Sequence, residues 1–372
     1  MKRHAIIPIF IPHQGCPNDC AFCNQRLVTA RSAAPSAPEM AAAMDAWLST
    51  LTNPRPPVIE VALYGGSFTG LPRDQQALYL QIALSYKQKG LVDRIRLSTR
   101  PDYIDEDILL FLKGFQVDVI ELGAQSFDQE VLRLSNRGHD SAAIYQSSRL
   151  IRRFGFTLGL QLMVGLPGDS YEKALFSARE AVFCRPAMAR LYPTVILEGT
   201  DLSRQYKEGL YRPFSQEEML RATKDMYRIL AGAGIQIIRV GLKSSDLVRN
   251  DGQGVLGNSF HPAFRQLVEG ELAKEDLEEQ LLSLLSRRKT QAPSLCPSFL
   301  SSFSPLSDSS GKAGGKKQIG RVRFLCHPRS FSNMLGNKGR NRAYFQNRYP
   351  FLTFRFQTDS SMKPGLYRAL ME

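Results

Sequence analysis

The amino-acid sequence predicts an α/β fold: a partial (β/α)6 TIM-like barrel followed by a small basic C-terminal accessory region. Over about the first 240 of its 372 residues, short β-branched apolar runs alternate with longer segments of helical periodicity. This is the pattern of parallel strands joined by crossover helices. Six or seven such units in this length favour a complete or partial barrel. A doubly wound open sheet is the alternative architecture.

The predicted strands are short and apolar, and the predicted helices carry apolar residues at three- and four-residue spacing. The strands are 5–11, 58–64, 94–98, 118–122, 157–164, 189–195 and 236–240. The helices are 38–50, 74–89, 105–114, 129–135, 142–154, 172–185 and 216–233. Every strand but the last is therefore followed by at least one helix.

After residue 240 the alternation stops, and the composition predicts four parts in the whole chain. A charged amphipathic helix is expected at 269–288, and strands at 321–326 and 351–356 around a basic helical stretch, 331–344. The segment between the charged helix and the first of these strands is rich in Ser, Pro, Gly and Lys and cannot bury a core. The predicted parts are a barrel at 1–245, a helical connection at 246–289, a linker or insertion at 290–318, and a small basic α/β accessory segment at 319–372.

The formal net charge of +13 is confined to the end of the chain. Residues 285–372 contain 16 Lys and Arg against 3 Asp and Glu, so residues 1–284 are neutral overall. A neutral body with a basic tail indicates either an anionic partner held by the tail or a solvated segment that keeps the protein soluble.

Targeting signals are not expected. The apolar run 5–11 is short and contains Pro8, and no stretch approaches the roughly 20 apolar residues of a membrane helix. We therefore expect a cytoplasmic protein without membrane association. In that reducing compartment, six cysteines indicate metal binding or catalysis rather than disulfides.

Three cysteines, Cys16, Cys20 and Cys23, fall within eight residues just after the first strand. Their spacing lets one loop surround a single metal centre. Thiolates suit a 4Fe-4S cluster, and three of them leave one iron without a protein ligand. That iron can chelate the amino and carboxylate groups of S-adenosylmethionine.

Other interpretations of these cysteines stay open. A structural zinc ion needs a fourth ligand, for which His13, Cys184 or a cysteine of the tail is available. A redox-active Cys-x2-Cys pair would use Cys20 and Cys23 alone. The cysteines could also be unrelated buried thiols.

The Cys-x3-Cys-x2-Cys spacing, with Phe22 before the last cysteine, resembles the radical S-adenosylmethionine superfamily. The resemblance implies that the three cysteines hold a 4Fe-4S cluster and that Phe22 lies beside the adenine. Gly65, Gly66 and Ser67 resemble the family's glycine motif, whose backbone meets the methionine amine. Glycine permits such close approach. The implied cofactors are a 4Fe-4S cluster and S-adenosyl-L-methionine, and the implied partner is a reducing electron-donor protein.

Polar residues and glycines at the ends of later strands are further candidates for cofactor binding. Arg100 and Gln125 follow the third and fourth strands and could hold the ribose, carboxylate or sulfonium, or else cap a helix or fix a loop. Gly165 follows the fifth strand and permits close approach to the adenine. The alternative for Gly165 is an ordinary strand-to-helix turn capped by Asp169 or Ser170.

The motifs at 98–102, 121–126, 137–139 and 190–194 are similar to the radical domain of the elongator catalytic-subunit family. The similarity covers about residues 4–243. That family modifies the wobble uridine of transfer RNA with acetyl-coenzyme A, which a second, acetyltransferase domain binds. Here the first two cysteines are closer together than in that family, and the chain after Val240 lacks the length and β/α rhythm of an acetyltransferase.

The basic tail contains a Gly-x-x-Gly motif, 336–339, followed by Arg340, Arg342, Tyr344 and Phe345. Such a loop can clamp a nucleic-acid backbone while neighbouring aromatics stack on bases. A turn in a basic surface helix is the alternative.

We therefore expect a radical enzyme that forms a 5′-deoxyadenosyl radical and abstracts hydrogen from its substrate, in RNA modification with transfer RNA as the leading substrate. One alternative is a small-molecule enzyme of the oxygen-independent coproporphyrinogen oxidase type. The other is a non-catalytic, zinc-containing RNA-binding module.

Overall fold

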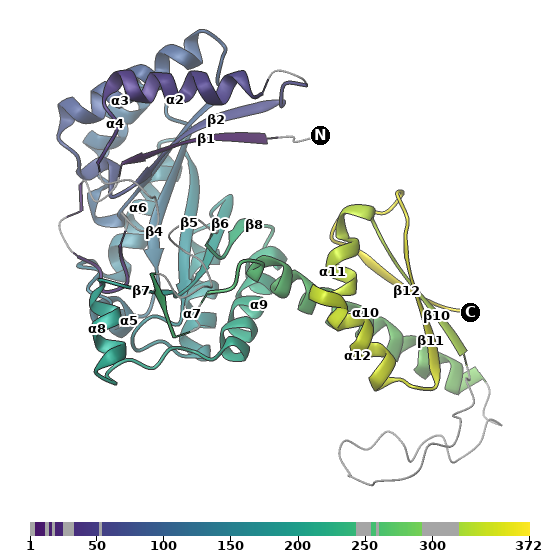
Figure 1. Cartoon of the computed structure of the whole chain (residues 1–372). Helices are drawn as coiled ribbons and strands as arrows, with labels where there is room; N and C mark the ends of the chain where they lie inside the picture. The colour runs from purple at the N-terminus through teal and green to yellow at the C-terminus, as the bar shows by residue number, and fades with distance from the viewer. Residues whose placement is uncertain are drawn as a thin grey trace. The chain divides into compact units, whose positions relative to one another are not determined.

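The computed structural model describes residues 4–11, 15–16, 19–24, 33–51, 54–242, 254–257, 260–291 and 320–372. The chain forms two compact units, Met1–Pro262 and Ala263–Glu372 (Figure 1). Most of the predicted linker, 290–318, lies outside the described residues, as does His13.

The N-terminal unit is built on a seven-stranded parallel sheet whose strands follow one another in sequence order. This order has no reversal of the kind that defines a doubly wound sheet, so the predicted partial barrel is confirmed. The strands are β1 (His4–Ile11), β2 (Val58–Gly65), β3 (Arg94–Thr99), β4 (Val119–Gln125), β5 (Thr157–Val164), β6 (Met188–Pro193) and β8 (Gln236–Val240).

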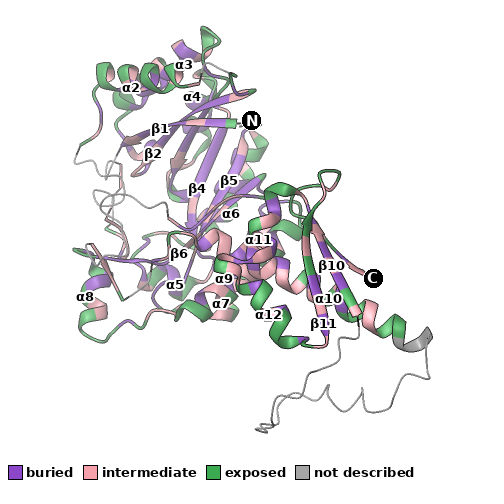
Figure 2. Cartoon of the chain, turned by 45° about the vertical axis from the view of Figure 1, so that its right-hand side comes forward, coloured by how far each residue is buried: buried purple, intermediate pink, exposed green. Residues whose placement is uncertain are grey.

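Helices connect successive strands and cover the sheet, whose central strands β4 and β5 are largely buried (Figure 2). Several helices begin at a side chain that accepts a hydrogen bond from a backbone N–H three residues ahead, among them Asp105, Asp140 and Ser170. Such caps fix where each helix starts. The helices are α2 (Ala37–Ser49), α3 (Arg73–Gln88), α4 (Glu106–Gly114), α5 (Gln129–Leu134), α6 (Ser141–Arg153), α7 (Tyr171–Phe183) and α9 (Gln216–Gly232).

The structure adds short elements after β6 and after β8 that the sequence patterns did not predict. Strand β7 (Ile196–Leu197) pairs antiparallel with β9 (Val255–Leu256), and a two-turn helix, α8 (Asp201–Lys207), follows β7. The predicted strand 189–195 was extended too far for this reason. These elements are too short to produce a clear periodicity.

The C-terminal unit is a three-stranded sheet with helices against it. Its strands are β10 (Gly320–Cys326), β11 (Leu352–Thr358) and β12 (Tyr367–Met371), in the order β11-β10-β12, and β12 was not predicted. Strand β10 pairs parallel with β11 and antiparallel with β12. The helices are α10 (Phe264–Gln291), α11 (Phe331–Leu335) and α12 (Arg340–Arg348).

Two features of this unit differ from the sequence expectation. Helix α10 is longer than the predicted 269–288 and is part of the core of this unit through Leu277 and Leu281, rather than a connection between units. The expected helical stretch 331–344 is broken at Gly336, whose φ of 73° is left-handed. Glycine adopts this conformation without steric cost.

The core of the C-terminal unit is centred on Phe324 of β10. Its ring lies 4.7 Å from that of Phe345 in α12, and 5.4 Å from each of Phe354 and Phe356 in β11, measured between centroids. In β10 the buried residues alternate with residues that are partly or fully exposed, so one face of the sheet packs on the helices.

None of the helices in the described part of the chain is both long enough and apolar enough to cross a lipid bilayer.

Replacement of Phe324 with Ala should destabilise the C-terminal unit by about 3–5 kcal/mol, because it removes a fully buried ring and leaves a cavity among its aromatic neighbours. The matched change Leu325→Ala, on the opposite face of the same strand, should cost about 1 kcal/mol or less. Hydrogen exchange of the β10 amides measures both effects. Equal protection in the two variants would contradict this view of the core.

Candidate functional site

A cavity opens at the carboxyl ends of β1 to β5, with about 740 Å³ of empty space including open solvent. Because parallel strands of a barrel end at the same rim, residues far apart in sequence meet there. All three candidate cysteines line this cavity, and so do most of the other candidate residues. The lining includes Cys16, Cys20, Phe22, Cys23, Gly65, Gly66, Arg100, Glu121, Gln125, Arg137 and Gln161.

The described part of the cysteine loop is fixed to two other segments of the barrel by backbone hydrogen bonds. The Ala21 N–H donates to the Ser135 carbonyl at 3.0 Å, and the Leu202 N–H donates to the Ala21 carbonyl at 2.7 Å. The cysteines are free thiols. Among the described residues, no three His, Cys, Asp or Glu side chains gather as they would around a single metal ion.

Arg137 places a positive charge against the cysteine loop. Its Nη1 donates to the Cys20 Sγ at 3.0 Å, and its Nη2 donates to the Gly123 carbonyl at 2.6 Å. Burial is the main cause that raises the pKa of the Cys16 thiol, the nearby Cys20 thiol adds to it, and Arg100 and Arg137 oppose it. Two guanidinium groups, those of Arg100 and Arg137, therefore act on the thiols, and the Asp19 carboxylate opposes their effect on Cys16.

Glycines let the cysteine loop and the loop after β2 touch through their backbones. A Cβ on Gly65 would lie 2.4 Å from the Ile11 carbonyl oxygen, and one on Gly15 would lie 2.1 Å from that of Ser67. Gly65 also has a φ of 110°, and Gly66 donates its N–H to Ile11 at 3.0 Å. Any side chain at Gly15 or Gly65 would push these loops apart.

The Ser67 side chain does not line the cavity. It is buried and hydrogen-bonded to Thr99 at 2.8 Å between the two hydroxyl oxygens, and it accepts the Arg100 N–H at 3.2 Å. The Thr99 hydroxyl also bonds to that of Thr69. This hydroxyl group network fixes the end of β2 to the end of β3.

Arg100 is held in place by one carboxylate and keeps one donor unused. Its Nε and Nη2 donate to the two oxygens of Asp102, at 3.0 and 2.8 Å. Its Nη1 is buried and has no hydrogen-bond partner among the described residues. A buried donor without a partner is costly, so this atom is suited to receive an anionic group in the cavity.

Two carboxamides lie side by side in the cavity wall. The Gln161 Nε2 donates to the Gln125 Oε1 at 3.3 Å. Gln125 has a φ of 65°, and the register between β4 and β5 shifts beside it. A non-glycine residue held in this conformation is under strain, which is characteristic of binding and catalytic sites.

Gly165 lies away from the lining of the cavity. Its N–H donates to the Asp169 carboxylate at 2.7 Å, its carbonyl accepts the Tyr211 hydroxyl, and Ser170 caps α7. Burial raises the pKa of Asp169 to about 6. The strand-to-helix turn, which was the alternative for this glycine, accounts for its position.

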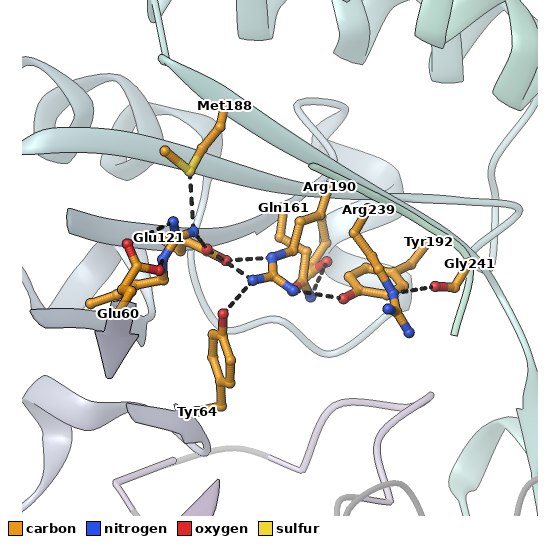
Figure 3. Close-up of polar contacts among 11 residues, drawn as sticks. Glu60, Tyr64, Glu121, Gln161, Met188, Arg190, Tyr192, Arg239 and Gly241 are labelled. Carbon is orange, nitrogen blue, oxygen red and sulfur yellow. Dashed lines mark hydrogen bonds and ion pairs between the residues drawn. The ribbon is translucent and has the colours of Figure 1, made fainter. Parts of the chain in front are cut away.

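Beneath the cavity, buried charges cross the concave face of the sheet (Figure 3). Arg96 donates to both Glu60 and Glu121, and Glu121 also pairs with Arg190, whose Nε lies 2.6 Å from its Oε2. Burial is the main cause that raises the pKa of Tyr64, which Arg190 contacts, to about 12. The network links β2, β3, β4 and β6.

Sequence reasoning missed the role of Arg137. It appeared only within a three-residue motif, and the contact with Cys20 joins residues 117 positions apart. No local pattern encodes such a distance. A useful signal was its position after the fourth strand, which places it at the rim of a barrel.

The donor set fits an iron-sulfur cluster with S-adenosylmethionine. Three thiols line one cavity, and the unpartnered Arg100 Nη1 lies in the same wall. Thiolates are the usual cluster ligands, and a guanidinium suits a carboxylate. The same wall contains the close backbone turn at Gly65 and Gly66 and the ring of Phe22.

Comparison with known families identifies two segments. Residues 10–180 match the Radical SAM superfamily, and residues 186–274 match the Radical_SAM C-terminal domain. The two matches together extend over the barrel and into the C-terminal unit.

Two named relatives match part of the chain. A tRNA uridine(34) acetyltransferase of Dehalococcoides mccartyi is 27% identical over 274 residues, which is 62% of this chain and 59% of the relative. One of Methanocaldococcus infernus is 32% identical over 185 residues, which is 44% of this chain and 34% of the relative. The chain thus spans between 34% and 59% of the length of these relatives.

A solved structure shares the fold. The archaeal Methanocaldococcus infernus Elp3 with its N-terminus deleted matches 66% of this chain and 61% of its own, with a TM-score of 0.51 and 21% sequence identity.

Replacement of Arg96 with Met should destabilise the N-terminal unit by about 3–5 kcal/mol, because Glu60 and Glu121 would remain buried with less compensation. The control Arg94→Met removes an exposed charge from the same strand and should change the stability by about 0.5 kcal/mol or less. Urea unfolding followed by the fluorescence of the only tryptophan, Trp47 in α2, measures both. Similar losses in the two variants would contradict the assigned network.

Proposed function

The chain belongs to the radical S-adenosylmethionine superfamily and is an enzyme of that class; from this premise we propose that it modifies RNA, with transfer RNA as its substrate. The observation that carries the proposal is that three thiols line one cavity together with Arg100, whose buried Nη1 has no hydrogen-bond partner among the described residues. When bound, the cluster and S-adenosyl-L-methionine supply a 5′-deoxyadenosyl radical that abstracts hydrogen.

In this proposal, the residues of the chain bind and orient these groups. Cys16, Cys20 and Cys23 are the cluster ligands. The Arg100 Nη1 donates to the carboxylate of the methionine moiety, while Asp102 fixes the plane of the guanidinium.

Other parts of the cavity wall have further proposed roles. The turn at Gly65 and Gly66 approaches the amine, and Phe22 packs against the adenine. Gln125 and Gln161 offer carboxamide groups to the ribose or to the substrate.

Two observations support RNA as the substrate. Two relatives that match part of the chain are named as tRNA uridine(34) acetyltransferases. Residues 320–372 contain ten Lys and Arg against two Asp and Glu, a charge that favours a polyanion. The remaining partner in this proposal is an electron-donor protein in a reducing, cytoplasmic compartment.

The variant Cys20→Ala should lose at least 90% of the iron bound after anaerobic reconstitution and should form no 5′-deoxyadenosine with a chemical reductant, since a cluster ligand is lost. Cys184→Ala removes a buried thiol outside the cavity and should retain both iron and activity. Iron analysis and chromatography of the nucleoside provide the two measurements. Activity that survives Cys20→Ala would refute the ligand assignment.

The RNA assignment has its own readout in the same assay. Addition of bulk transfer RNA should increase the rate of 5′-deoxyadenosine formation above the rate without substrate, and mass spectrometry of the RNA should show a modified nucleoside. No stimulation and no modification would leave the radical chemistry intact but exclude transfer RNA as the substrate.

Arg137→Met should lower the reduction potential of the cluster by about 60 mV for each 1.4 kcal/mol of lost interaction. The positive donor beside the Cys20 sulfur favours the more negative, reduced cluster. Potentiometric titration monitored by electron paramagnetic resonance measures the potential. Arg133→Met, an equal loss of charge at an exposed position of α5, should leave it unchanged, and equal shifts in both variants would rule out the specific contact.

A further inference from the structure

The sheet of the C-terminal unit has one face that the helices do not use. Val322, Phe324 and Cys326 of β10 point into the core formed with α10, α11 and α12, together with Leu352 and Phe354 of β11. Because side chains alternate along a strand, the residues between them lie on the opposite face.

That opposite face is rich in arginine. It carries Arg321 and Arg323 on β10, Arg355 on β11 and Arg368 on β12. Three of them, Arg321, Arg355 and Arg368, are exposed. We call this surface the arginine face.

The strand register places these arginines close together. Arg323 is the direct neighbour of Arg355 in the parallel ladder, and Arg368 is opposite Leu325, two residues further along β10. With a rise of about 3.3 Å per residue, the positions from Arg321 to Leu325 extend over roughly 13 Å. This length exceeds a single phosphate group.

Little on the described surface neutralises this charge. Arg323 has a carboxylate, that of Glu372, at 3.3 Å, and the Asp359 carboxylate interacts electrostatically with Arg368. Within the described residues, no hydrogen bond or ion pair is found for the side chains of Arg321 and Arg355. Like charges on adjacent strands are destabilising, so the arrangement costs stability unless an anion covers it.

We propose that the arginine face binds the phosphate backbone of the RNA substrate. The inference rests on the proposed function for the choice of RNA and adds the surface that holds it. Each exposed guanidinium can donate two hydrogen bonds to a phosphate, with a geometry that lysine does not provide.

The composition of the face also indicates how the RNA is held. Its other strand residues are Leu325, Thr353, Gln357 and Leu370, and no strand position on this face is aromatic. The aromatic rings on which successive bases stack in many RNA-binding proteins are therefore absent from these positions. In this proposal the guanidinium groups contact phosphates, which positions the RNA without reading its sequence.

The Gly-x-x-Gly motif of this unit has a different explanation. Gly336, Lys338 and Gly339 all have left-handed φ values, 73°, 53° and 76°, where α11 turns into α12. A Cβ on Gly336 would meet the Asn341 side chain at 2.7 Å, and the Asn341 Nδ2 donates to the Gly270 carbonyl. The turn packs α11, α12 and α10 together. This structural role accounts for the glycines of the motif without a nucleic acid.

The test compares two triple variants of the full chain with equal loss of charge. One, R321Q/R355Q/R368Q, removes the exposed arginines of the face. The control, R340Q/R342Q/R348Q, removes exposed arginines from α12, whose Phe345 packs on the other side of the sheet. Filter binding of bulk transfer RNA across a range of salt concentrations measures affinity and its salt dependence.

The face variant should bind roughly fiftyfold more weakly at 0.15 M salt and lose about 2 from the slope of log K against log salt, if each arginine neutralises one phosphate. The α12 variant should bind within about twofold of the parent chain. Circular dichroism confirms that both variants fold.

Other outcomes would overturn the proposal. Equal weakening in both variants would mean that charge alone, and not this face, attracts RNA, and a loss only in the α12 variant would move the site to the helix. Unchanged RNA binding together with lost binding to phosphatidylglycerol vesicles would make a lipid surface the occupant. Formation of 5′-deoxyadenosine in the absence of RNA tests the radical chemistry separately. A failure of the proposed radical chemistry can therefore be distinguished from a failure of the proposed RNA-binding surface.

Discussion

One buried carboxylate, that of Glu121, holds the concave side of the barrel together. It pairs with Arg96 and Arg190, and Arg96 in turn pairs with Glu60, so that strands β2, β3, β4 and β6 share one network. Breaking such a buried pair is costly because the remaining charge has no water to stabilise it. Glu121 also lines the cavity, so the same interaction that fixes the strands forms the floor of the site.

The network also explains a constraint on the neighbouring strand. A Cβ on Gly159 of β5 would lie 2.8 Å from the Glu121 Cγ, so a larger residue there would push the carboxylate from its two arginines. The ion pairs of Glu121 therefore require a glycine at position 159. A rigid, charged floor orients a bound group without the reorganisation that water would require.

The sequence predicted what depends on short-range patterns. The barrel is confirmed, since each strand and helix has its own periodicity, and the cysteine spacing predicted thiols that do share a cavity, although their role as ligands stays a prediction. Contacts between residues far apart in the sequence could not be predicted from such patterns. Arg137 reaches Cys20 across 117 positions, and α10 looked like a connection because its packing partner β10 lies beyond a long segment. Gly165 was a candidate because a glycine after a strand can either let a ligand approach the backbone or form a turn into the next helix, and the sequence does not distinguish these roles.

The placement of arginine differs between the two units in a way that follows from solvation. In the barrel, Arg96 is buried and carries two carboxylates, because an unpaired charge in a low-dielectric core is prohibitive. On the arginine face, Arg321 and Arg355 remain hydrated, which makes them available to an external anion at little desolvation cost. Radical chemistry needs a cavity that excludes water, whereas phosphate binding needs charge at the surface. In the proposed function the two tasks therefore belong to different surfaces, radical chemistry to the cavity of the barrel and phosphate binding to the arginine face of the C-terminal unit.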